Sequence, residues 1–251
     1  MPEFQGKTRA FFIHFLLSAV FALGAGAIIV FCWYPSIFLY ISNGTQIILL
    51  IAAVDVVLGP LISLVIFSKK KSARALVLDY TAIGVLQIAA LGYGLWTAYE
   101  SRPQFLVFEY KNFYVVHASD LGENRKFANE FKQQPKSHGI HIVSLRPPRN
   151  GTEQLEIINK SLGGLTEALQ FELWQPYALA ISDIKAQCKE LAEIKNSVAR
   201  KQLDAAVKES PSSRSSEKHC FLPVIARQQV WTASIDKATG QPTGFFPIDT
   251  L

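Results

Sequence analysis

Two polar residues lie within long apolar stretches of the sequence, where an acid or an amide is costly to place. Asp55 lies about 10 residues, or ~15 Å of helix, into the apolar run 45–67, and Gln87 lies about 12 residues, or ~18 Å, into the run 75–98. In antiparallel helices these distances add up to a membrane thickness of about 30 Å, so the two side chains can meet at one depth. Acids inside a membrane are candidates for function, and a structural polar contact between packed helices is the alternative.

A proline follows Asp55 after about one helical turn. Because Pro60 removes a backbone hydrogen bond, the pair Gly59-Pro60 predicts a kink in this helix. A kink beside a polar side chain can open a groove for another helix, or it can serve internal packing alone. We therefore take Asp55, Gly59, Pro60 and Gln87 as candidate residues for binding a partner helix.

Residue types that carry out catalysis do not form a recognised pattern in this chain. His138 and His141 are close in sequence but lie at the start of a predicted strand rather than on a helix face, which disfavours a metal site. His219 and Cys220 have no orienting carboxylate nearby in the sequence. No Gly-rich phosphate loop or zinc motif is present. The sequence therefore predicts a protein that is not an enzyme and has no catalytic residue, metal site or cofactor.

The distribution of charge shows which elements carry Asp55 and Gln87. Residues 100–251 hold 19 of the 25 basic residues and 17 of the 20 acidic residues, so the first 99 residues are almost uncharged. Three apolar runs, 10–34, 45–67 and 75–98, each exceed the ~20 residues that cross a bilayer as a helix. We expect a three-helix transmembrane domain over residues 1–99 and an exported domain over residues 100–251.

The basic residues of the first part of the chain predict its orientation. Lys7 and Arg9 precede the first run, the cluster 69–74 joins the second and third runs, and the connection 35–44 has no basic residue. By the positive-inside rule, the N-terminus and the cluster 69–74 are cytoplasmic, and everything after the third run is periplasmic. The first run is also too long for the apolar core of a cleaved signal peptide, so we expect an uncleaved helix.

Several further residues have predicted structural roles at the ends of these helices. Asp79 lies within reach of the cluster 69–74 and is expected to pair with Arg74 or a neighbouring lysine. Pro103 is expected to end the third helix just after Arg102. Because the basic residues join apolar runs instead of lining one face with aromatic residues, the lipid bilayer is an expected partner and nucleic acid is not.

The exported part has the pattern of an α+β domain with an antiparallel sheet. Aromatic and β-branched runs with a two-residue turn between the first two predict a hairpin and further strands, and helical spacing of apolar residues predicts helices between them. The predicted strands are 105–110, 113–117, 139–145, 221–227, 229–236 and 243–248, and the predicted helices are 119–134, 159–173 and 181–207. A Ser-rich linker is expected at 211–216.

Two of the three cysteines lie in the exported part, whereas Cys32 lies in the first apolar run. An oxidising compartment allows Cys188 and Cys220 to form a disulfide, which would close a loop of about 32 residues. Two unpaired thiols are the alternative.

The combination of these motifs resembles the TfpX/TfpZ family of type IV pilin accessory proteins over nearly the whole chain. The residues that carry the resemblance are Trp33-Tyr34-Pro35, the stretch from Asp55 to Gly59-Pro60, Leu78-Asp79, Gln87, Tyr93-Gly94, Arg102-Pro103 before Phe108, the run 221–227 and the turn 236–244.

The resemblance implies a bacterial inner-membrane protein that associates with the major type IV pilin and promotes its stability or assembly into pili, with the pilus assembly machinery as a further partner. A membrane-bound pilin-modifying enzyme is the alternative, and it would need polar catalytic residues in an exported loop. A transmembrane sensor would need a cytoplasmic output domain, for which the short segments before residue 10 and between runs two and three leave no room.

Overall fold

The computed structural model describes residues 2–66, 72–210 and 218–251. The predicted basic residues Lys69, Lys70 and Lys71 and the predicted linker 211–216 lie outside these described residues. The chain forms two compact units. We call Met1–Pro35 together with Asn43–Arg102 the helical unit, and Ser36–Ser42 together with Pro103–Leu251 the α+β unit.

The helical unit contains three helices that are long and apolar enough to cross a membrane, as the sequence predicts. We call these candidate spans one (Phe11–Trp33), two (Gly44–Ile66) and three (Arg74–Glu100). Only 17%, 28% and 6% of their most apolar windows are buried within the protein, so most of their apolar side chains face outward. Such outward-facing apolar surface is what lipid would cover, because water would not.

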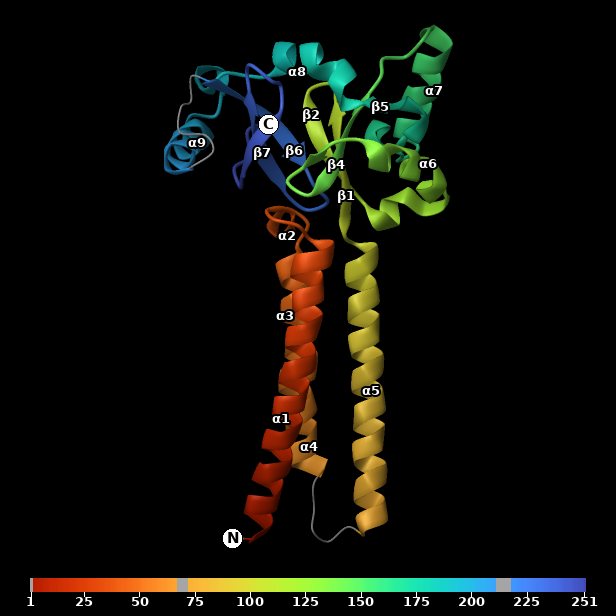
Figure 1. Ribbon diagram of the computed structural model, residues 1–251, viewed down its shortest axis with the longest axis vertical. Coiled ribbons are helices and arrows are strands. Elements are labelled where there is room, and N and C mark those ends of the chain that lie inside the picture. The colour runs from red at the N-terminus through yellow and green to blue at the C-terminus, as the bar shows by residue number, and fades with distance from the viewer. Residues whose placement is uncertain (1, 67–71, 211–217) are drawn as a thin grey trace. The chain divides into compact units, whose positions relative to one another are not determined.

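The hydrogen bonding within these spans is not uniform. Span one consists of α1 (Pro2–Ile28) and a π-helical end, η1 (Ile29–Trp33), and span three of the single helix α5 (Ala73–Glu100). Span two changes from α3 (Gly44–Ala52) to the π-helical segment η2 (Ala53–Leu58) and then to α4 (Gly59–Ile66). Contacts join span two to both of the other spans, and Figure 1 shows the helices running alongside one another.

The π-helical segment η2 contains Asp55 and comes directly before the Gly59-Pro60 pair. Pro60 has no N–H and cannot bond to the carbonyl group one turn earlier, so regular α-helical bonding fails over this turn. A π-helical turn is one way in which a helix redistributes such bonds. The irregularity expected from the proline therefore lies around Asp55 itself.

The α+β unit is built on one sheet with the strand order β3-β4-β1-β2-β6-β7-β8, in which β5 also pairs with β4. The strands are β1 (Pro103–Glu109), β2 (Asn112–His117), β3 (Lys136–Ser137), β4 (Ile140–Leu145), β5 (Trp174–Pro176), β6 (His219–Ile225), β7 (Val230–Asp236) and β8 (Pro242–Phe246). The α+β class is confirmed.

Most neighbouring strands of the sheet are antiparallel, as expected, and two pairs are parallel, so the sheet is mixed. The hairpins β1–β2, β6–β7 and β7–β8 are antiparallel as expected, whereas β1–β4 and β2–β6 are parallel pairs. Short turns reveal a hairpin in the sequence, but a parallel pair joins strands that are distant in the chain and leaves no local signal.

Both faces of the sheet are buried, which explains the nearly continuous apolar strands. Along β1, Leu106 and Phe108 enter one core cluster, while Phe105 and Val107 enter the cluster on the opposite face. The first cluster is covered by helix α8 (Ile181–Gln187), and the second by α6 (Arg125–Glu130) and α7 (Gly151–Leu162). Helix α9 (Ser197–Glu209) packs against β6 and β8 through a third cluster.

The helices of the α+β unit differ in extent from those predicted. The single helix expected at 181–207 is divided into α8 and α9, because the chain leaves the helix at Cys188 to form a disulfide with Cys220 and a bridge between Lys189 and Phe221. The helix expected at 159–173 is instead α7, which begins where the Asn150 side chain accepts a hydrogen bond from the Glu153 N–H. The helix expected at 119–134 is short, with α6 between two 3-10 turns.

The connection between spans one and two contributes to the core of the α+β unit. We call Ser36–Ser42 the docking segment. It contains the short helix α2 (Phe38–Ile41), labelled in Figure 1, and Phe38 and Ile41 are fully buried in the first core cluster. The Phe38 ring lies 5.5 Å from that of Phe245, measured between centroids. The α+β unit is therefore assembled from two separate stretches of chain.

Polar contacts also hold the docking segment. The Gln229 side-chain amide donates to the carbonyl oxygens of Tyr40 (2.8 Å) and Ile41 (3.1 Å), and His117 Nε2 lies 3.0 Å from the Ser42 hydroxyl. The Asp120 carboxylate accepts from the His117 N–H at 2.8 Å and pairs with Arg227. Burial acts to raise the pKa of Asp120, but the hydrogen bonds from His117 and Arg227 outweigh it and hold that pKa below its usual value.

Candidate functional site

A polar cluster joins all three spans of the helical unit, with Gln87 at its centre. The Gln87 side-chain oxygen accepts a hydrogen bond from His14 Nε2 at 2.5 Å. Its amide nitrogen donates to the Ser18 hydroxyl at 3.4 Å and to the main-chain carbonyl of Asp55 at 3.2 Å. Because His14 Nε2 must donate to an oxygen that only accepts, His14 Nδ1 is left to accept from the Ser63 hydroxyl. The side chain of Gln87 is thus fully used inside the bundle.

Gly59 makes room for this cluster. A Cβ atom added at Gly59 would lie 2.0 Å from Gln87 Nε2, so the Gln87 amide would have to move out of its present hydrogen bonds. Gly94 of span three has a similar role, since a Cβ there would lie 2.8 Å from the Ile51 side chain of span two. Small residues at such positions let neighbouring helices approach closely. Gly59 and Gln87 therefore set the packing of spans two and three.

Asp55 differs from Gln87 because its carboxyl group is buried without a partner. The residue is only 4% exposed, and Oδ1 has no hydrogen bond to any of the described residues. Lys and Arg are absent from residues 10–68, so the first two spans contain no cation for it. The sequence predicted a contact between Gln87 and Asp55, and the contact found is with the Asp55 main chain, which leaves the carboxyl free.

Two adjoining pockets lie between spans two and three and share Val54 and Ala90. One has a volume of about 500 Å³ and is lined by Leu58, Gly59 and Gln87 among others. The other, of about 220 Å³, is lined by Asp55, Tyr93 and Gly94 among others. We call the two together the lateral groove. Pro60 is buried beside Gly59 in α4. Apolar side chains dominate the walls, and the acidic lining residues are Asp55 in the smaller pocket and Asp79 in the larger one.

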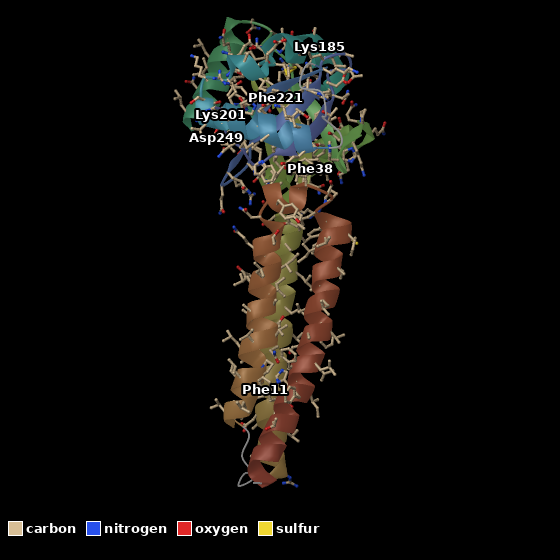
Figure 2. All side chains as sticks on the ribbon, turned by 90° about the vertical axis from the view of Figure 1, so that its left-hand side faces the viewer. Phe11, Phe38, Lys185, Lys201, Phe221 and Asp249 are labelled. Atoms are coloured by element: carbon tan, nitrogen blue, oxygen red, sulfur yellow. A yellow bond between two sulfur atoms is a disulfide. The ribbon has the colours of Figure 1, made fainter. Side chains whose placement is uncertain are left out.

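Outside the groove, the helical unit presents its apolar side chains outward along its length, with Phe11 near one end (Figure 2). Phe12, Leu16 and Leu23 of span one are 60%, 65% and 74% exposed, so a hydrophobic surface by itself does not mark a site here. The lateral groove is distinguished by its concave shape and by the uncompensated Asp55 carboxyl, which lipid chains cannot hydrogen-bond.

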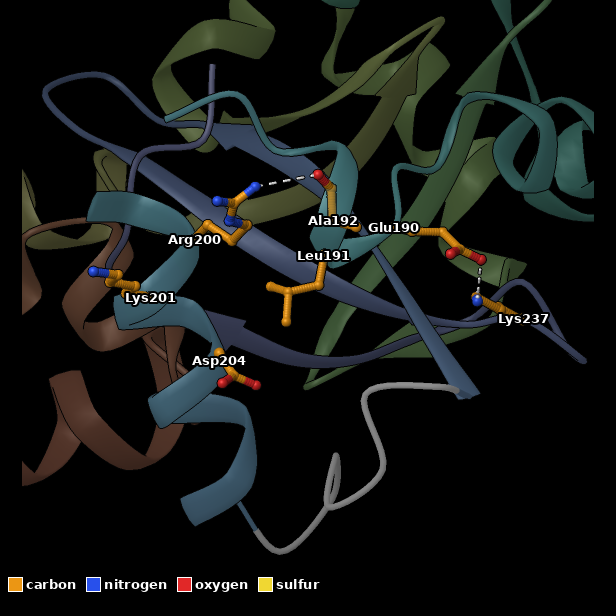
Figure 3. Close-up of a pocket in the computed structure, with 7 residues that line it drawn as sticks. All are labelled: Glu190, Leu191, Ala192, Arg200, Lys201, Asp204 and Lys237. Atoms are coloured by element: carbon orange, nitrogen blue, oxygen red, sulfur yellow. Dashed lines mark hydrogen bonds and ion pairs between the residues drawn. The ribbon is translucent and has the colours of Figure 1, made fainter. Parts of the chain in front are cut away.

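Another hollow, of about 480 Å³, lies on the α+β unit beside α9 (Figure 3). Its charged side chains have both signs and are partly used: Lys237 pairs with Glu190 at 2.6 Å, and Arg200 donates to the Ala192 carbonyl at 3.4 Å. It contains no buried, uncompensated group among its lining residues Glu190, Leu191, Ala192, Arg200, Lys201, Asp204 and Lys237. We therefore regard the lateral groove as the stronger candidate.

The residues with predicted structural roles lie near the ends of span three. Asp79 lines the larger pocket of the lateral groove, and its pairing with Arg74 or a lysine stays a prediction. The Arg102 guanidinium lies 3.5 Å from the centre of the Tyr99 ring and donates to the Tyr99 carbonyl, beyond the end of α5 at Glu100. Pro103 begins strand β1.

The histidines and cysteines of the α+β unit have structural contacts. The His138 ring lies 4.9 Å from that of Phe245, and burial lowers its pKa. His141 Nδ1 donates to the Gln134 carbonyl at 3.0 Å. Cys188 and Cys220 form the predicted disulfide, and Cys32 is a free thiol. Within the described parts of the chain, no three His, Cys, Asp or Glu side chains gather as metal ligands would.

Comparison with known proteins shows which family this chain is related to. The family model of the fimbrial assembly protein FimB matches residues 2–42, which include span one and the docking segment. The fimbrial assembly protein of serogroup E1 from Dichelobacter nodosus is 30% identical over 229 residues, covering 90% of this chain and 89% of that protein. The chain belongs to the fimbrial assembly protein family.

Two further proteins that are similar to this chain support the same family. The serogroup I protein of Dichelobacter nodosus is also 30% identical over 229 residues, covering 90% of this chain and 89% of its own. The protein of serogroups C1 and C2 from the same organism is 31% identical over 109 residues, or 43% of this chain and 83% of its own. No solved structure matches the chain. The resemblance to type IV pilin accessory proteins is thereby confirmed, and the relatives are named as assembly proteins, not as enzymes.

Three members of the polar cluster, His14, Ser18 and Ser63, are not among the candidate residues predicted from the sequence. A signal was present, because His14 and Ser18 are four residues apart and so lie on one face of a helix. Polar residues repeated on one face of an apolar helix mark the side that packs against other helices.

Proposed function

We propose that this fimbrial assembly protein binds the major type IV pilin in the bacterial inner membrane and acts as a chaperone or assembly factor, without catalysing a reaction. The observation that carries the proposal is the lateral groove, an apolar concave surface along two adjacent spans. A type IV pilin has an apolar transmembrane helix and an exported globular head. A groove between spans is the kind of surface on which an apolar helix can pack by shape, because lipid gives little hydrophobic driving force between helices.

The proposal includes an orientation in the membrane. We place the N-terminus and the cluster 69–74 in the cytoplasm, so that a transmembrane domain over 1–99 is followed by a periplasmic domain over 100–251. The asymmetry of the basic residues supports this orientation. The disulfide between Cys188 and Cys220 also supports it, because disulfides persist in the oxidising periplasm.

The same orientation can be tested by cysteine labelling of the whole protein in a Cys32→Ser background. Arg74→Cys and Lys111→Cys introduce thiols at two described positions, before span three and in the turn between β1 and β2. A membrane-impermeant maleimide applied to cells with a permeabilised outer membrane should label position 111 and leave position 74 unlabelled until the inner membrane is opened. Equal labelling at both positions would reject the proposed topology.

Within the lateral groove, the candidate residues divide into two roles. Gly59 and Gln87 hold spans one to three in the packing that leaves the groove, and Pro60 maintains the π-helical turn around Asp55. The walls, including Leu58 and Ala90, would contact the pilin helix. The pilus assembly machinery is a further proposed partner, since a pilin held in the membrane must be transferred to it.

Photocrosslinking in living cells tests pilin binding at the groove. A photoreactive phenylalanine analogue at Leu58 or Ala90 reports on the groove. The same analogue at Val65 or Val85 is the matched control, because these exposed positions lie on the same spans but line neither pocket of the groove. We expect a pilin adduct from the groove positions only. Equal adducts at all four positions, or none in cells that make pili normally, would contradict binding at the groove.

A further inference from the structure

The polar cluster of the helical unit gives each of its side chains, on His14, Ser18, Ser63 and Gln87, a hydrogen-bond partner. The carboxyl oxygen Oδ1 of Asp55 has none, and the hydroxyls of Thr45 and Tyr80 are the other buried side-chain atoms without a partner in the described part of this unit. His14 uses both ring nitrogens, on Gln87 and Ser63, and Gln87 uses both ends of its amide. The Asp55 carboxyl has none of these partners, although its own main-chain carbonyl takes part in the cluster. The bundle thus satisfies the Asp55 backbone and leaves the Asp55 side chain unsatisfied.

The surroundings of the carboxyl group make this arrangement costly. The smaller pocket of the lateral groove is lined mainly by apolar side chains such as Ile47, Leu50 and Ile51, and the Asp55 residue is 4% exposed. A buried polar group without a hydrogen bond destabilises a fold, and a buried charge without a partner destabilises it more. A fold that needed only packing at this position would be more stable with a leucine.

We infer that Asp55 is the recognition group of the lateral groove, and that its carboxyl accepts a hydrogen bond from a donor at mid-membrane depth on the pilin's transmembrane helix. This inference rests on the proposed function. It adds a chemical requirement to it, namely that the partner helix is apolar and carries a hydroxyl, amide or amine group where it meets Asp55. The donor on the pilin helix supplies the missing hydrogen bond, so binding offsets the unfavourable free energy of the unpaired carboxyl in the free protein.

Geometry supports the same assignment. Ala90 of span three, a small residue, lines the same pocket as Asp55, whereas the space beside Gly94 is already filled by the Ile51 side chain of span two. Small residues allow a third helix to approach closely, and close approach is what a short aspartate side chain needs to reach a donor. Gln87 cannot serve instead, since its amide is already committed to spans one and two.

This role and a structural role predict opposite effects on stability. If Asp55 stabilises the bundle, Asp55→Leu should lower the thermal midpoint of the helical unit. If Asp55 is held unpaired for a partner, Asp55→Leu should leave that midpoint unchanged or raise it, and should reduce pilin binding by about ten-fold or more, the loss expected for one hydrogen bond to a charged group.

The experiment uses the full-length protein, co-expressed with an epitope-tagged major pilin, extracted in mild detergent and compared at equal protein level. Asp55→Leu removes the acceptor, and Asp55→Asn keeps an acceptor oxygen but removes the charge. Gln87→Leu is the matched control, because it removes a polar side chain of the same bundle whose partners are internal, and it should lower the thermal midpoint by leaving His14 and the Asp55 carbonyl unpaired.

Each outcome has a defined meaning. Loss of pilin with Asp55→Leu but not with Asp55→Asn supports a neutral donor, and loss with both variants at an unreduced thermal midpoint supports a cationic donor. Undiminished capture by Asp55→Leu, or a thermal midpoint that falls as it does for Gln87→Leu, would overturn the inference. If the wild-type protein itself captures no pilin, the proposed function fails, and that result is distinct from failure of the role of Asp55.

Discussion

The two units of this protein use polar groups in different ways. In the α+β unit, side chains such as Gln229, Asp120 and Tyr177 bond to the unit's own backbone or to one another, and they hold distant parts of the chain together. In the helical unit, the cluster centred on Gln87 and the bond from the Tyr34 hydroxyl to the Ala98 carbonyl connect the spans, while apolar side chains cover most of the outer surface.

The two units also differ in how many buried polar side-chain atoms lack a hydrogen-bond partner. Within the described residues there are five such side-chain atoms, and three of them, on Thr45, Asp55 and Tyr80, belong to the smaller helical unit. In water-soluble folds such atoms are usually eliminated, because each one costs stability. The other two atoms, on Gln170 and Trp231, belong to the larger α+β unit, so the helical unit holds more of them for its size among the described residues.

The largest expected effect on stability tests whether the docking segment is part of the folded α+β unit. Phe38→Ala should lower the free energy of unfolding of the α+β unit by about 3–5 kcal/mol, since it removes a fully buried aromatic ring from the main core cluster. Pulse proteolysis in denaturant measures this change. Tyr40→Ala is the control, because that side chain is 56% exposed and the substitution keeps the carbonyl that Gln229 binds. An equal effect of the two substitutions would show that the segment is only a loop.

The disulfide comes next in size. Replacing Cys188 and Cys220 together by serine should lower the free energy of unfolding by about 3–4 kcal/mol on the entropic model, because the bond closes a loop of 32 residues. Cys32→Ser should have little effect, since that thiol is free and exposed. Denaturant midpoints under non-reducing conditions give the comparison. Mass spectrometry that finds both thiols free in protein purified without a reductant would refute the bond.

A smaller effect is expected from a single methyl group in the helical unit. Gly59→Ala should lower stability by about 1–3 kcal/mol, because the new Cβ would clash with Gln87 and disturb the polar cluster. Gly84→Ala of span three is the matched control, since nothing lies within 4 Å of its Cβ position and alanine favours a helix. Thermal midpoints in detergent should therefore move in opposite directions. Equal shifts would mean that the cluster does not set the packing.

The smallest effect concerns pH and the contacts around the docking segment. The pKa of Asp120 is lower in the folded protein than its usual value of about 3.9, so its ionised form adds stability above that pH, and the contribution is lost as pH falls through the folded pKa. Asp120→Asn should remove this part of the acid sensitivity of the α+β unit.

Asp120→Asn has to be compared with the wild type at each pH, because the ionisation of Glu109 has the opposite effect on the free energy of unfolding. Burial raises the pKa of Glu109, so its ionisation weakens the fold as pH rises above about 4.3. Urea unfolding at pH 3, 5 and 7 separates the two groups, since Glu109 is unchanged in the variant. Identical pH profiles for variant and wild type would exclude a role for Asp120.

Comparison of sequence and structure shows which features leave a local signal. The three spans and the hairpin β1–β2 were predicted because length, apolar runs and turn residues act over a few neighbouring positions. The break of the predicted 181–207 helix at Cys188 was not, because helical spacing continues past it and only the bond to Cys220 redirects the chain. The α7 helix was misplaced because the capping residue Asn150 was assigned to a loop.

For the candidate site, the order of residues alone places Asp55 and Gln87 at one depth, since helical rise and membrane thickness are fixed quantities. The three-dimensional fold selected the hydrogen bonds of Gln87 to His14 and to the Asp55 backbone, which leave the Asp55 carboxyl unpaired. It also decided that β1 pairs in parallel with β4 and that Phe38 enters the core of the α+β unit. These features depend on which distant surfaces meet, and such contacts are selected by packing and hydrogen bonding over the whole fold, which no short stretch of sequence encodes.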